Sequence, residues 1–296
     1  MLTNKVAIVT GAGGGLGRAH AHLLARYGAR VIVNDMDPAA AGRVAEEIAA
    51  SGGEAIAIAA SVTDESQVAA MVERAVSTWE RVDILINNAG ILRDKSFAKV
   101  SLDDFRLVLE VHLMGAVICT KAVWDLMRQQ RYGRIVMTTS SSGLYGNFGQ
   151  SNYGAAKMAL VGLMQTLALE GEKYNVRVNC LAPTAATQMT EGVLSKEALT
   201  QLDPRLVSPG LLALVSDDAP TRAILCAGAG HFARAYVTLT EGQYIGGGAD
   251  AGERVIEQWD RIADRTSDIV PEYGFKQAER EIASAGCEAP TMAQAR

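Results

Sequence analysis

The chain has 296 residues, 49% of them hydrophobic, and a formal net charge of −5. This size suits one α/β domain with a large core and extra chain at its C-terminus, and the acidic balance argues against a nucleic-acid partner. The four cysteines lack metal-site spacing, so we expect reduced thiols and no metal. Because the sequence shows no secretory leader, peroxisomal signal or apolar run of roughly 18 residues, we expect a cytoplasmic protein without a membrane partner.

Apolar strand-like runs alternate with amphipathic helical patterns through the first part of the chain. The expected strands span residues 5–10, 30–35, 55–60 and 82–86, and the expected helices span residues 16–27, 38–51 and 66–79. Continuous apolar runs of this kind are typical of parallel strands that are buried on both faces. The alternation therefore predicts a doubly wound α/β fold, with helices on both sides of the sheet.

The same alternation continues to residue 248 and then stops. A long helix is expected at residues 101–131, and further strands are expected at 134–137, 176–182 and 223–230. Beyond residue 248, a helical pattern places four apolar side chains on one face, namely Val255, Ile256, Trp259 and Ile262. We therefore expect a seven-stranded parallel sheet within residues 1–248, and a helical extension with a flexible tail at residues 249–296.

A glycine-rich loop follows the first expected strand and leads into the first expected helix. It contains Gly11, Gly15, Leu16 and Gly17. Glycines let the backbone approach a pyrophosphate, whose charge the helix N-terminus stabilises. Asp35 ends the next strand, where a carboxylate accepts hydrogen bonds from the adenosine ribose and repels a 2′-phosphate. Arg18 is counter-evidence, because a base after the glycines can hold that phosphate. We expect NAD, with NADP the less favoured cofactor.

A tyrosine and a lysine stand four residues apart in a run of helix-forming residues. Positions i and i+4 share one face of a helix, so Tyr153 and Lys157 are expected to lie side by side. Two cations, Lys157 and an oxidised nicotinamide, would lower the tyrosine pKa from about 10 and make it an acid or base near neutral pH. Ser140 follows the apolar run at 134–137, where its hydroxyl can hold a carbonyl oxygen. An isolated Tyr-x-x-x-Lys match more often marks a solvated helix face than a catalytic pair. The other motifs in the chain decide between these two interpretations.

Three motifs, in this order and spacing, resemble the short-chain dehydrogenase/reductase family. They are the glycine loop at 10–17, the run Asn87-Asn88-Ala89-Gly90, and Tyr153-x-x-x-Lys157. The resemblance implies a Rossmann fold and an NAD-dependent enzyme that interconverts a secondary alcohol and a ketone. It implies that Tyr153 exchanges the substrate proton, that Lys157 supports this tyrosine and binds the nicotinamide ribose, and that Ser140 positions the substrate oxygen.

The same resemblance implies further contacts with the cofactor. Beyond the glycine loop and Asp35, these are Ser61, Val62, Asn88, Ala89, Gly90, Tyr153, Lys157, Pro183 and Thr187. Ser61 departs from the aspartate that the family commonly has beside the adenine. Pro183 and Thr187 are expected to meet the carboxamide end of the nicotinamide, and residues 184–199 are expected to form a mobile segment over the substrate.

One position in the long expected helix departs from the family. The catalytic asparagine that shapes a water relay is replaced by His112. A lone helical histidine is often structural, and the alternative at this position is that His112 supports the proton relay. Together with residues 87–94, 142–150 and 182–184, this departure makes the chain similar to one branch, the (3R)-hydroxyacyl-CoA dehydrogenase modules of peroxisomal multifunctional enzymes.

That branch implies a (3R)-hydroxyacyl-CoA substrate and a 3-oxoacyl-CoA product. A 17β-hydroxysteroid or another 3-oxoacyl thioester is an alternative, because each presents an oxygen beside a bulky apolar body. A CoA substrate needs basic groups at the pocket mouth, for which Arg93 and Lys95 are candidates. A non-catalytic dinucleotide-binding scaffold is the alternative from a different class, although Ser140, Tyr153 and Lys157 argue against it. The family favours homo-oligomers, and the C-terminal extension favours a dimer over a tetramer.

Overall fold

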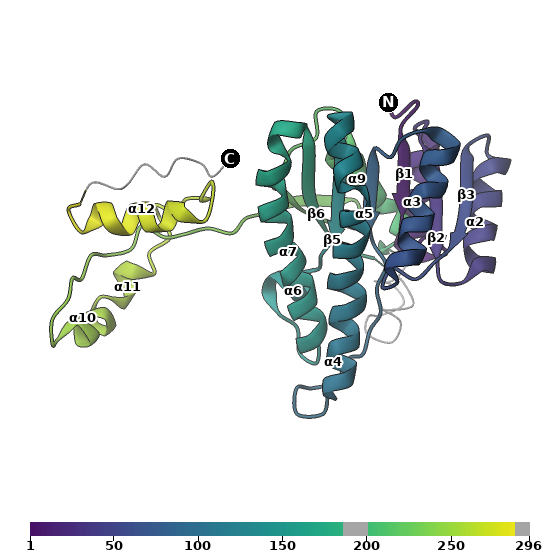
Figure 1. Ribbon diagram of the computed structural model, residues 1–296. Coiled ribbons are helices and arrows are strands. Elements are labelled where there is room, and N and C mark those ends of the chain that lie inside the picture. The colour runs from purple at the N-terminus through teal and green to yellow at the C-terminus, as the bar shows by residue number, and fades with distance from the viewer. Residues whose placement is uncertain (186–200, 288–296) are drawn as a thin grey trace. The chain divides into compact units, whose positions relative to one another are not determined.

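The computed structural model describes residues 1–185 and 201–287 of the chain. The chain divides into two compact units, Met1–Ala235 and Tyr236–Arg296 (Figure 1). This division falls earlier in the sequence than residue 248, where the composition changes. The first unit contains every predicted catalytic and cofactor-binding residue, so it positions the candidate site.

The first unit is built on one eight-stranded sheet. Its strands are β1 (Val6–Val9), β2 (Arg30–Asp35), β3 (Glu54–Ala59), β4 (Ile84–Asn87), β5 (Gly133–Thr138), β6 (Val176–Thr184), β7 (Ile224–Gly228) and β8 (His231–Ala235). Their spatial order is β3-β2-β1-β4-β5-β6-β7-β8. Strands β1 to β7 pair in parallel, which confirms the predicted doubly wound sheet, whereas β8 pairs antiparallel with β7 and was not predicted.

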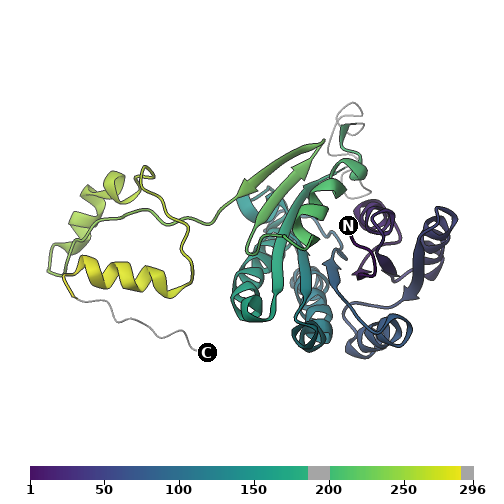
Figure 2. The same ribbon diagram turned by 90° about the horizontal axis from the view of Figure 1, so that it is seen from above.

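Helices cover both faces of this sheet, and each face has its own apolar core. One core joins the sheet to α1 (Gly15–Arg26), α2 (Pro38–Ala50) and α9 (Ser208–Val215). The other joins it to α3 (Glu65–Trp79), α5 (Gly115–Gln130) and α7 (Ser151–Gly171). Figure 2 shows the sheet from above with helices on both sides. The central strands β1, β4 and β5 are buried at every position, because these helices cover both faces of the sheet there.

Side-chain caps fix several helix starts. The Asp64 carboxylate accepts hydrogen bonds from the backbone N–H groups of Ser66 and Gln67 at 2.9 and 3.0 Å, and α3 begins there. Asp37 caps α2 in the same way, and Pro38 occupies the first helical position. Such caps satisfy N–H groups that lack partners within the helix, so these boundaries follow from local sequence.

The long helical stretch from Leu102 to Gln130 is not one regular α-helix. It consists of α4 (Leu102–Leu109), the π-helical segment η1 (Glu110–Met114) and α5. By length and composition alone this stretch could cross a membrane. One helix of this kind is weak evidence for a membrane span, because the buried core helix of a soluble protein passes the same test. Its apolar positions instead pack on the sheet, as the burial of Val123 and Met127 shows. A π-helical insertion within such a helix often marks a functional site.

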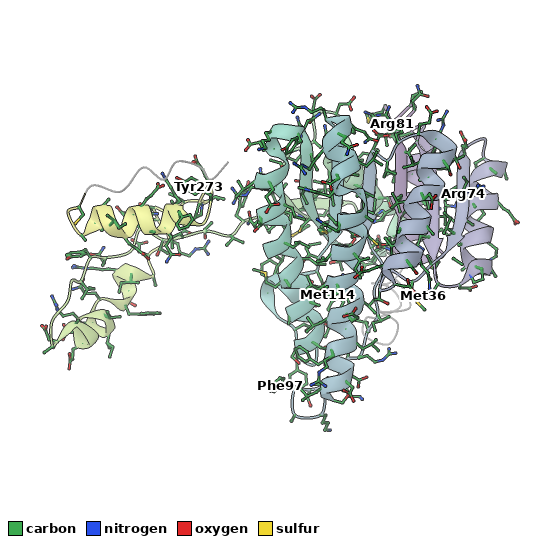
Figure 3. The ribbon with its side chains drawn as sticks, viewed as in Figure 1. Met36, Arg74, Arg81, Phe97, Met114 and Tyr273 are labelled. Carbon is green, nitrogen blue, oxygen red and sulfur yellow. The ribbon has the colours of Figure 1, made fainter. Side chains whose placement is uncertain are left out.

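The carboxyl ends of the parallel strands meet at one edge of the sheet. Figure 3 labels Met36, directly after β2, at this lower edge, and Arg81, before β4, at the opposite edge. The strand order reverses between β1 and β4, whose neighbours continue in opposite directions. Ligands of open α/β sheets bind outside the strand ends at such a switch point. The glycine loop after β1 and Asn88 after β4 therefore flank the expected crevice.

The second unit is small and helical in its described part. It contains α10 (Ala251–Glu257), α11 (Trp259–Ile262) and α12 (Phe275–Ser284). Leu239 and Ile269 form an isolated antiparallel bridge. Within residues 236–287, no residue is buried in the isolated chain. Among the described residues, the remaining short elements lie in the first unit and are α6 (Ser141–Tyr145), η2 (Glu172–Tyr174) and η3 (Pro204–Leu206).

Candidate active site

The glycine loop has backbone geometry that side chains would obstruct. Gly11 and Gly15 have φ angles of +61° and +50°, which L-residues rarely adopt. At Gly17, a Cβ atom would collide with the backbone oxygen of Gly11. The Nδ2 atom of Asn88 donates hydrogen bonds to the backbone oxygens of Thr10 and Gly11 at 2.9 and 3.2 Å. The end of β4 therefore fixes the loop that follows β1.

This loop fits a dinucleotide pyrophosphate. In the part of the chain that the structure describes, α1 has no side-chain cap at Gly14 and no acidic residue in its first turn. A Cβ atom on Gly14 would meet nothing within 4 Å, so space remains in front of the loop. The backbone N–H groups at the start of α1, including those of Leu16 and Gly17, are thus free to meet an anion at the positive end of the helix dipole.

The carboxylate of Asp35 lies against this loop. Its Oδ2 atom accepts a hydrogen bond from the backbone N–H of Gly13 at 2.9 Å, and its Oδ1 atom accepts one from Asp37 at 3.1 Å. These two bonds hold the carboxylate at the end of β2 and beside the first turn of α1. The acid that the sequence singles out is therefore fixed in position next to the glycine loop.

The guanidinium of Arg18 is paired with a carboxylate on α2. Its Nε atom donates to Oε2 of Glu47 at 2.8 Å, and the Nε2 atom of His22 lies 2.9 Å from the same oxygen. The hydrogen bond from Arg18 is the largest cause that holds the pKa of Glu47 below its usual range. Arg18, the residue that favours NADP, is therefore paired with Glu47. The sequence did not predict this pair, because the two residues lie on different helices.

The residues that follow β3 and β4 lie at the same edge of the sheet as the glycine loop. The Ser61 hydroxyl lies 2.9 Å from the Thr63 hydroxyl, and Val62 is buried. The Thr10 hydroxyl accepts hydrogen bonds from the backbone N–H groups of Asn88 and Ala89 at 3.0 and 3.1 Å. These bonds tie the end of β4 to the end of β1.

Pro183 lies near the end of β6 and pairs in register with Ala227 of β7. Thr187 and almost all of the expected mobile segment at 184–199 lie outside the described residues.

Ser140, Tyr153 and Lys157 come together at the end of β5. Ser140 follows this strand and caps α6, with its Oγ atom accepting a hydrogen bond from the Ser142 backbone at 3.2 Å. On α7, the Nζ atom of Lys157 lies 5.4 Å from the centre of the Tyr153 ring. That Nζ atom donates to the backbone oxygen of Thr138 at 2.6 Å, so the last residue of β5 anchors the lysine.

Burial acts on both ionisable members of this group. Burial raises the pKa of Tyr153 above its usual value, and a hydrogen bond with Ser140 opposes the rise. Burial lowers the pKa of Lys157 to about 7. Without a bound dinucleotide the pKa of Tyr153 is therefore raised, and the expected lowering by Lys157 together with an oxidised nicotinamide stays a prediction. The physical reason is that desolvation disfavours the charged forms of both the phenol and the amine.

His112 lies in the π-helical segment η1, with its ring against that of Tyr153. The ring centroids are 5.2 Å apart and the rings are nearly perpendicular, at 86°. The Nε2 atom of His112 lies 2.7 Å from the backbone oxygen of Ile91 and 3.1 Å from its nitrogen. Burial lowers the pKa of His112 to about 3, so the imidazole is neutral. A Cβ atom on Gly90 would collide with this ring, which explains the glycine there.

A small cavity lies behind the lysine. Its volume is about 10 Å³, which is room for about one water molecule, and its lining includes Asn87, His112 and Lys157. Two buried atoms, Oδ1 of Asn87 and Nδ1 of His112, have no hydrogen-bond partner among the described residues. Buried polar atoms are normally satisfied, so this lining suits an ordered water.

The loop after β4 contacts the start of α7, which spacing in the sequence gave no means to detect. The Nε2 atom of Gln150 donates to Oδ2 of Asp94 at 2.6 Å, and Nδ2 of Asn152 donates to the backbone oxygen of Arg93 at 3.1 Å.

The two side chains proposed to bind CoA phosphates are both paired with Asp104. Lys95 lies 3.1 Å and Arg93 lies 3.7 Å from its carboxylate oxygens. Across residues 1–185 and 201–287, no cluster of metal-ligating side chains is present.

A family model described as short chain dehydrogenase matches residues 5–198. Peroxisomal multifunctional enzyme type 2 of Drosophila melanogaster is 50% identical over 214 residues, which are 69% of this chain and 35% of the relative. A solved structure of that full-length enzyme superposes with a TM-score of 0.81 at 37% identity, covering 96% of this chain and 49% of the other. Peroxisomal multifunctional enzyme A of Dictyostelium discoideum is 45% identical over 252 residues, 82% of this chain and 56% of the relative.

A third relative is known with its cofactor. It is a 7α-hydroxysteroid dehydrogenase solved with NADH and 7-oxo glycochenodeoxycholic acid, with a TM-score of 0.72, 31% identity, and coverage of 77% of this chain and 94% of that one. This chain spans about a third to a half of the length of the two multifunctional relatives. The matched family model, the parallel sheet and the nicotinamide-binding fold agree, and the chain therefore belongs to the short-chain dehydrogenase family of oxidoreductases.

Proposed function

We propose that this protein is an NAD-dependent dehydrogenase that interconverts a (3R)-hydroxyacyl-CoA and a 3-oxoacyl-CoA. The observation that carries the reaction class is the grouping of Ser140, Tyr153 and Lys157 at the carboxyl end of β5. The substrate class rests on the resemblance of the motifs to hydroxyacyl-CoA dehydrogenase modules, and the similarity to peroxisomal multifunctional enzymes supports it. Because those relatives are longer than this chain, the proposal covers a dehydrogenase activity and not the other activities of the multifunctional enzymes.

In the proposed reaction, Tyr153 exchanges a proton with the substrate oxygen and Ser140 holds that oxygen. Of these two groups the phenol is the stronger acid, so it is the one that can ionise once a cation binds beside it, and the Ser140 hydroxyl can donate to an oxygen on which negative charge develops. A bound oxidised nicotinamide would supply the hydride acceptor and a positive charge that favours the phenolate of Tyr153. As the phenolate, Tyr153 accepts the hydroxyl proton of the substrate, and loss of this proton and of the hydride from the alcohol carbon leaves a ketone.

Lys157 and His112 support this exchange in the proposal. Thr138 anchors Lys157, and in this proposal the lysine contacts the nicotinamide ribose and passes a proton towards Tyr153. A pKa near 7 lets Lys157 both take and give a proton at neutral pH. His112 stays neutral and binds the backbone of Ile91, so it acts through shape and hydrogen bonds. The small cavity that it shares with Lys157 suits a relay water.

NAD is the proposed cofactor, with NADP less favoured. The fixed carboxylate of Asp35 supports this choice, since it would accept hydrogen bonds from ribose hydroxyls and repel a 2′-phosphate. The pairing of Arg18 with Glu47 supports it as well, because this cation already has an anionic partner. Ser61 and Val62 are proposed to lie beside the adenine, and Ala89, Gly90, Pro183 and Thr187 along the nicotinamide half.

A hydroxysteroid is the second candidate substrate, and one relative favours it. The 7α-hydroxysteroid dehydrogenase is solved with an oxo bile acid. In addition, Arg93 and Lys95 are paired with Asp104, which weakens the case for these two as CoA phosphate ligands. A non-catalytic scaffold is the alternative from another class.

A homo-oligomer, with a dimer favoured, is the proposed assembly. The second unit exposes Ile256 and Trp259 at 77% and 61%, and none of its described residues is buried in the isolated chain. A segment of this size cannot hold a fold without buried apolar area, so we propose that it packs on its own domain or on a second copy of the chain. The compartment is proposed to be cytoplasmic or peroxisomal, the latter because the relatives are named as peroxisomal.

The experiment that tests the function is a substrate panel. The purified chain is mixed with NAD or NADP and with (3R)-hydroxyacyl-CoAs of several lengths or with hydroxysteroids, and absorbance of the reduced cofactor is followed. We expect the highest kcat/KM with a hydroxyacyl-CoA and NAD. Turnover of hydroxysteroids and of no hydroxyacyl-CoA would show that the substrate is a hydroxysteroid. Tight dinucleotide binding without turnover across the panel would establish the scaffold instead.

A further inference from the structure

The loop that follows β4 carries an acidic residue whose position is fixed by two hydrogen-bonded links to α7. The first link runs through Gln150, the N-cap residue of α7. Its Nε2 atom donates to Oδ2 of Asp94 at 2.6 Å. Its Oε1 atom accepts hydrogen bonds from the Ser142 hydroxyl at 2.7 Å and from Asn147 at 3.1 Å. An amide with both ends occupied is held in one orientation, so the carboxylate that it binds is held as well.

The second link runs through Asn152, which is fully buried. Its Nδ2 atom donates to the backbone oxygen of Arg93 at 3.1 Å, and its Oδ1 atom accepts from the backbone N–H of Tyr153 at 2.8 Å. Two consecutive loop residues are thus bound by residues that stand three positions and one position before Tyr153. This arrangement places Asp94 beside the first turn of the helix that carries Tyr153.

The charges around the Tyr153 ring come from three elements. Lys157 lies on the same helix, and burial leaves it only partly protonated at neutral pH. His112 packs on the ring from η1 and is neutral. Asp94 approaches from the loop, and its negative charge adds to the rise in the pKa of Tyr153 that burial causes. The neighbouring cations Arg93 and Lys95 pair with Asp104 and not with Asp94.

We propose that Asp94 is a positioning residue of this site, whose carboxylate, fixed by Gln150 at the start of α7, opposes the ionisation of Tyr153. This inference rests on the proposed acid–base role of Tyr153. Its consequence is that the phenol keeps its proton until a positive charge arrives in the site. The protonated phenol is the form that ketone reduction needs, and the ionised form is the one that alcohol oxidation needs.

The first test needs no turnover. Ionisation of tyrosine is followed by ultraviolet absorbance in the dinucleotide-free protein, and the signal of Tyr153, one of eight tyrosines, is isolated by subtracting the Tyr153→Phe variant in each background. In Asp94→Asn, we expect Tyr153 to ionise at lower pH than in the wild type. Asp103→Asn is the matched control, because Asp103 is 95% exposed and pairs with Arg106 on the surface.

The second test uses the pH profile of alcohol oxidation. On its acidic limb we expect kcat/KM of Asp94→Asn to exceed that of the wild type by about two- to fivefold, the range for an exposed charge that solvent screens. Gln150→Met keeps the charge and removes its anchor, so we expect a smaller shift in the same direction.

A titration of Asp94→Asn that coincides with the wild type, or a shift no larger than that of Asp103→Asn, would overturn the proposal. If Asp94→Asn fails to fold, by its circular dichroism spectrum, Gln150→Met decides: an unshifted titration there counts against the proposal. Absence of turnover in the wild type refutes the proposed function and leaves the absorbance test of Asp94 intact.

Discussion

The ammonium nitrogen of Lys157 lies 5.4 Å from the centre of the Tyr153 ring, one helical turn along the same face of α7. Thr138, at the end of β5, takes the hydrogen bond of this lysine at 2.6 Å. Burial disfavours the charged form of both side chains. The site therefore brings together a base and an acid whose protonation states depend on any further charge that enters.

Replacement of Tyr153 by Phe is expected to lower kcat by about 10²- to 10⁴-fold, the range for loss of a positioned acid or base. The phenyl ring keeps its packing against His112, so the NAD dissociation constant is expected to stay close to the wild-type value. Both constants are measured on the substrate found in the panel. Tyr145→Phe, on the 72% exposed Tyr145, is the control. Turnover of Tyr153→Phe within tenfold of the wild type would contradict the assigned role.

The stability of the protein is expected to rise with pH because of Lys157. Its pKa is about 7 in the folded protein and about 10.4 when unfolded, so the unfolded chain binds more protons between these values. The free energy of unfolding then increases with pH in this window, by up to about 1.4 kcal/mol per pH unit from this group. Urea titrations of the wild type and Lys157→Met at pH 7 and pH 10 measure the effect. We expect Lys157→Met to raise the free energy of unfolding at pH 7 and to raise it less at pH 10. An equal increase at both pH values would refute the lowered pKa of Lys157.

His112 is expected to act without changing its charge. Because its pKa is about 3, no histidine limb is expected in the pH–rate profile between pH 5 and 8. His112→Ala removes the bond to Ile91 and is expected to lower kcat by about 10- to 100-fold through misplacement of the site. His112→Asn, which can still bond that backbone, should keep more activity than His112→Ala. Equal activities of these two variants would show that the bond to Ile91 is irrelevant.

Glu47 is expected to contribute to cofactor choice by holding Arg18. Glu47→Gln weakens the pairing at 2.8 Å and frees the guanidinium for a 2′-phosphate. We expect the kcat/KM ratio of NADP to NAD to rise by about two- to fivefold, as for an exposed ion pair. Glu46→Gln, at the adjacent exposed position on α2, is the matched control. A ratio in Glu47→Gln equal to that control would mean that Arg18 does not reach the cofactor.

The exposed side chains of α10 and α11 are expected to be covered by a second copy. Ile256→Asp places a charge at a position that is 77% exposed in the isolated chain and should weaken self-association. Analytical ultracentrifugation across a concentration series measures the effect. Glu257→Gln, on the next residue, controls for a change in charge alone. Dimerisation of Ile256→Asp with wild-type affinity would exclude this face from the interface.

The sequence alone determined the doubly wound sheet and the reaction class. The apolar runs, the caps and the glycines act over a few residues, so local physics sets where β1 to β7 and most helices begin and end. The motif around Tyr153 and Lys157 is likewise local, because one helical turn joins its two members. Edge strand β8 carried no such signal, since four of its five residues are exposed and its pairing with β7 alone makes it a strand.

Only the tertiary structure decided the electrostatics of the site. Burial comes from helices and strands distant in sequence, and burial is what shifts the pKa of Tyr153 upward and that of Lys157 downward. The same holds for contacts that join Asp94 to Gln150 and Arg18 to Glu47, which are 56 and 29 residues apart. Spacing along a chain predicts neighbours within one helix or strand, whereas the partner of a loop or of a second helix is fixed by how the elements pack.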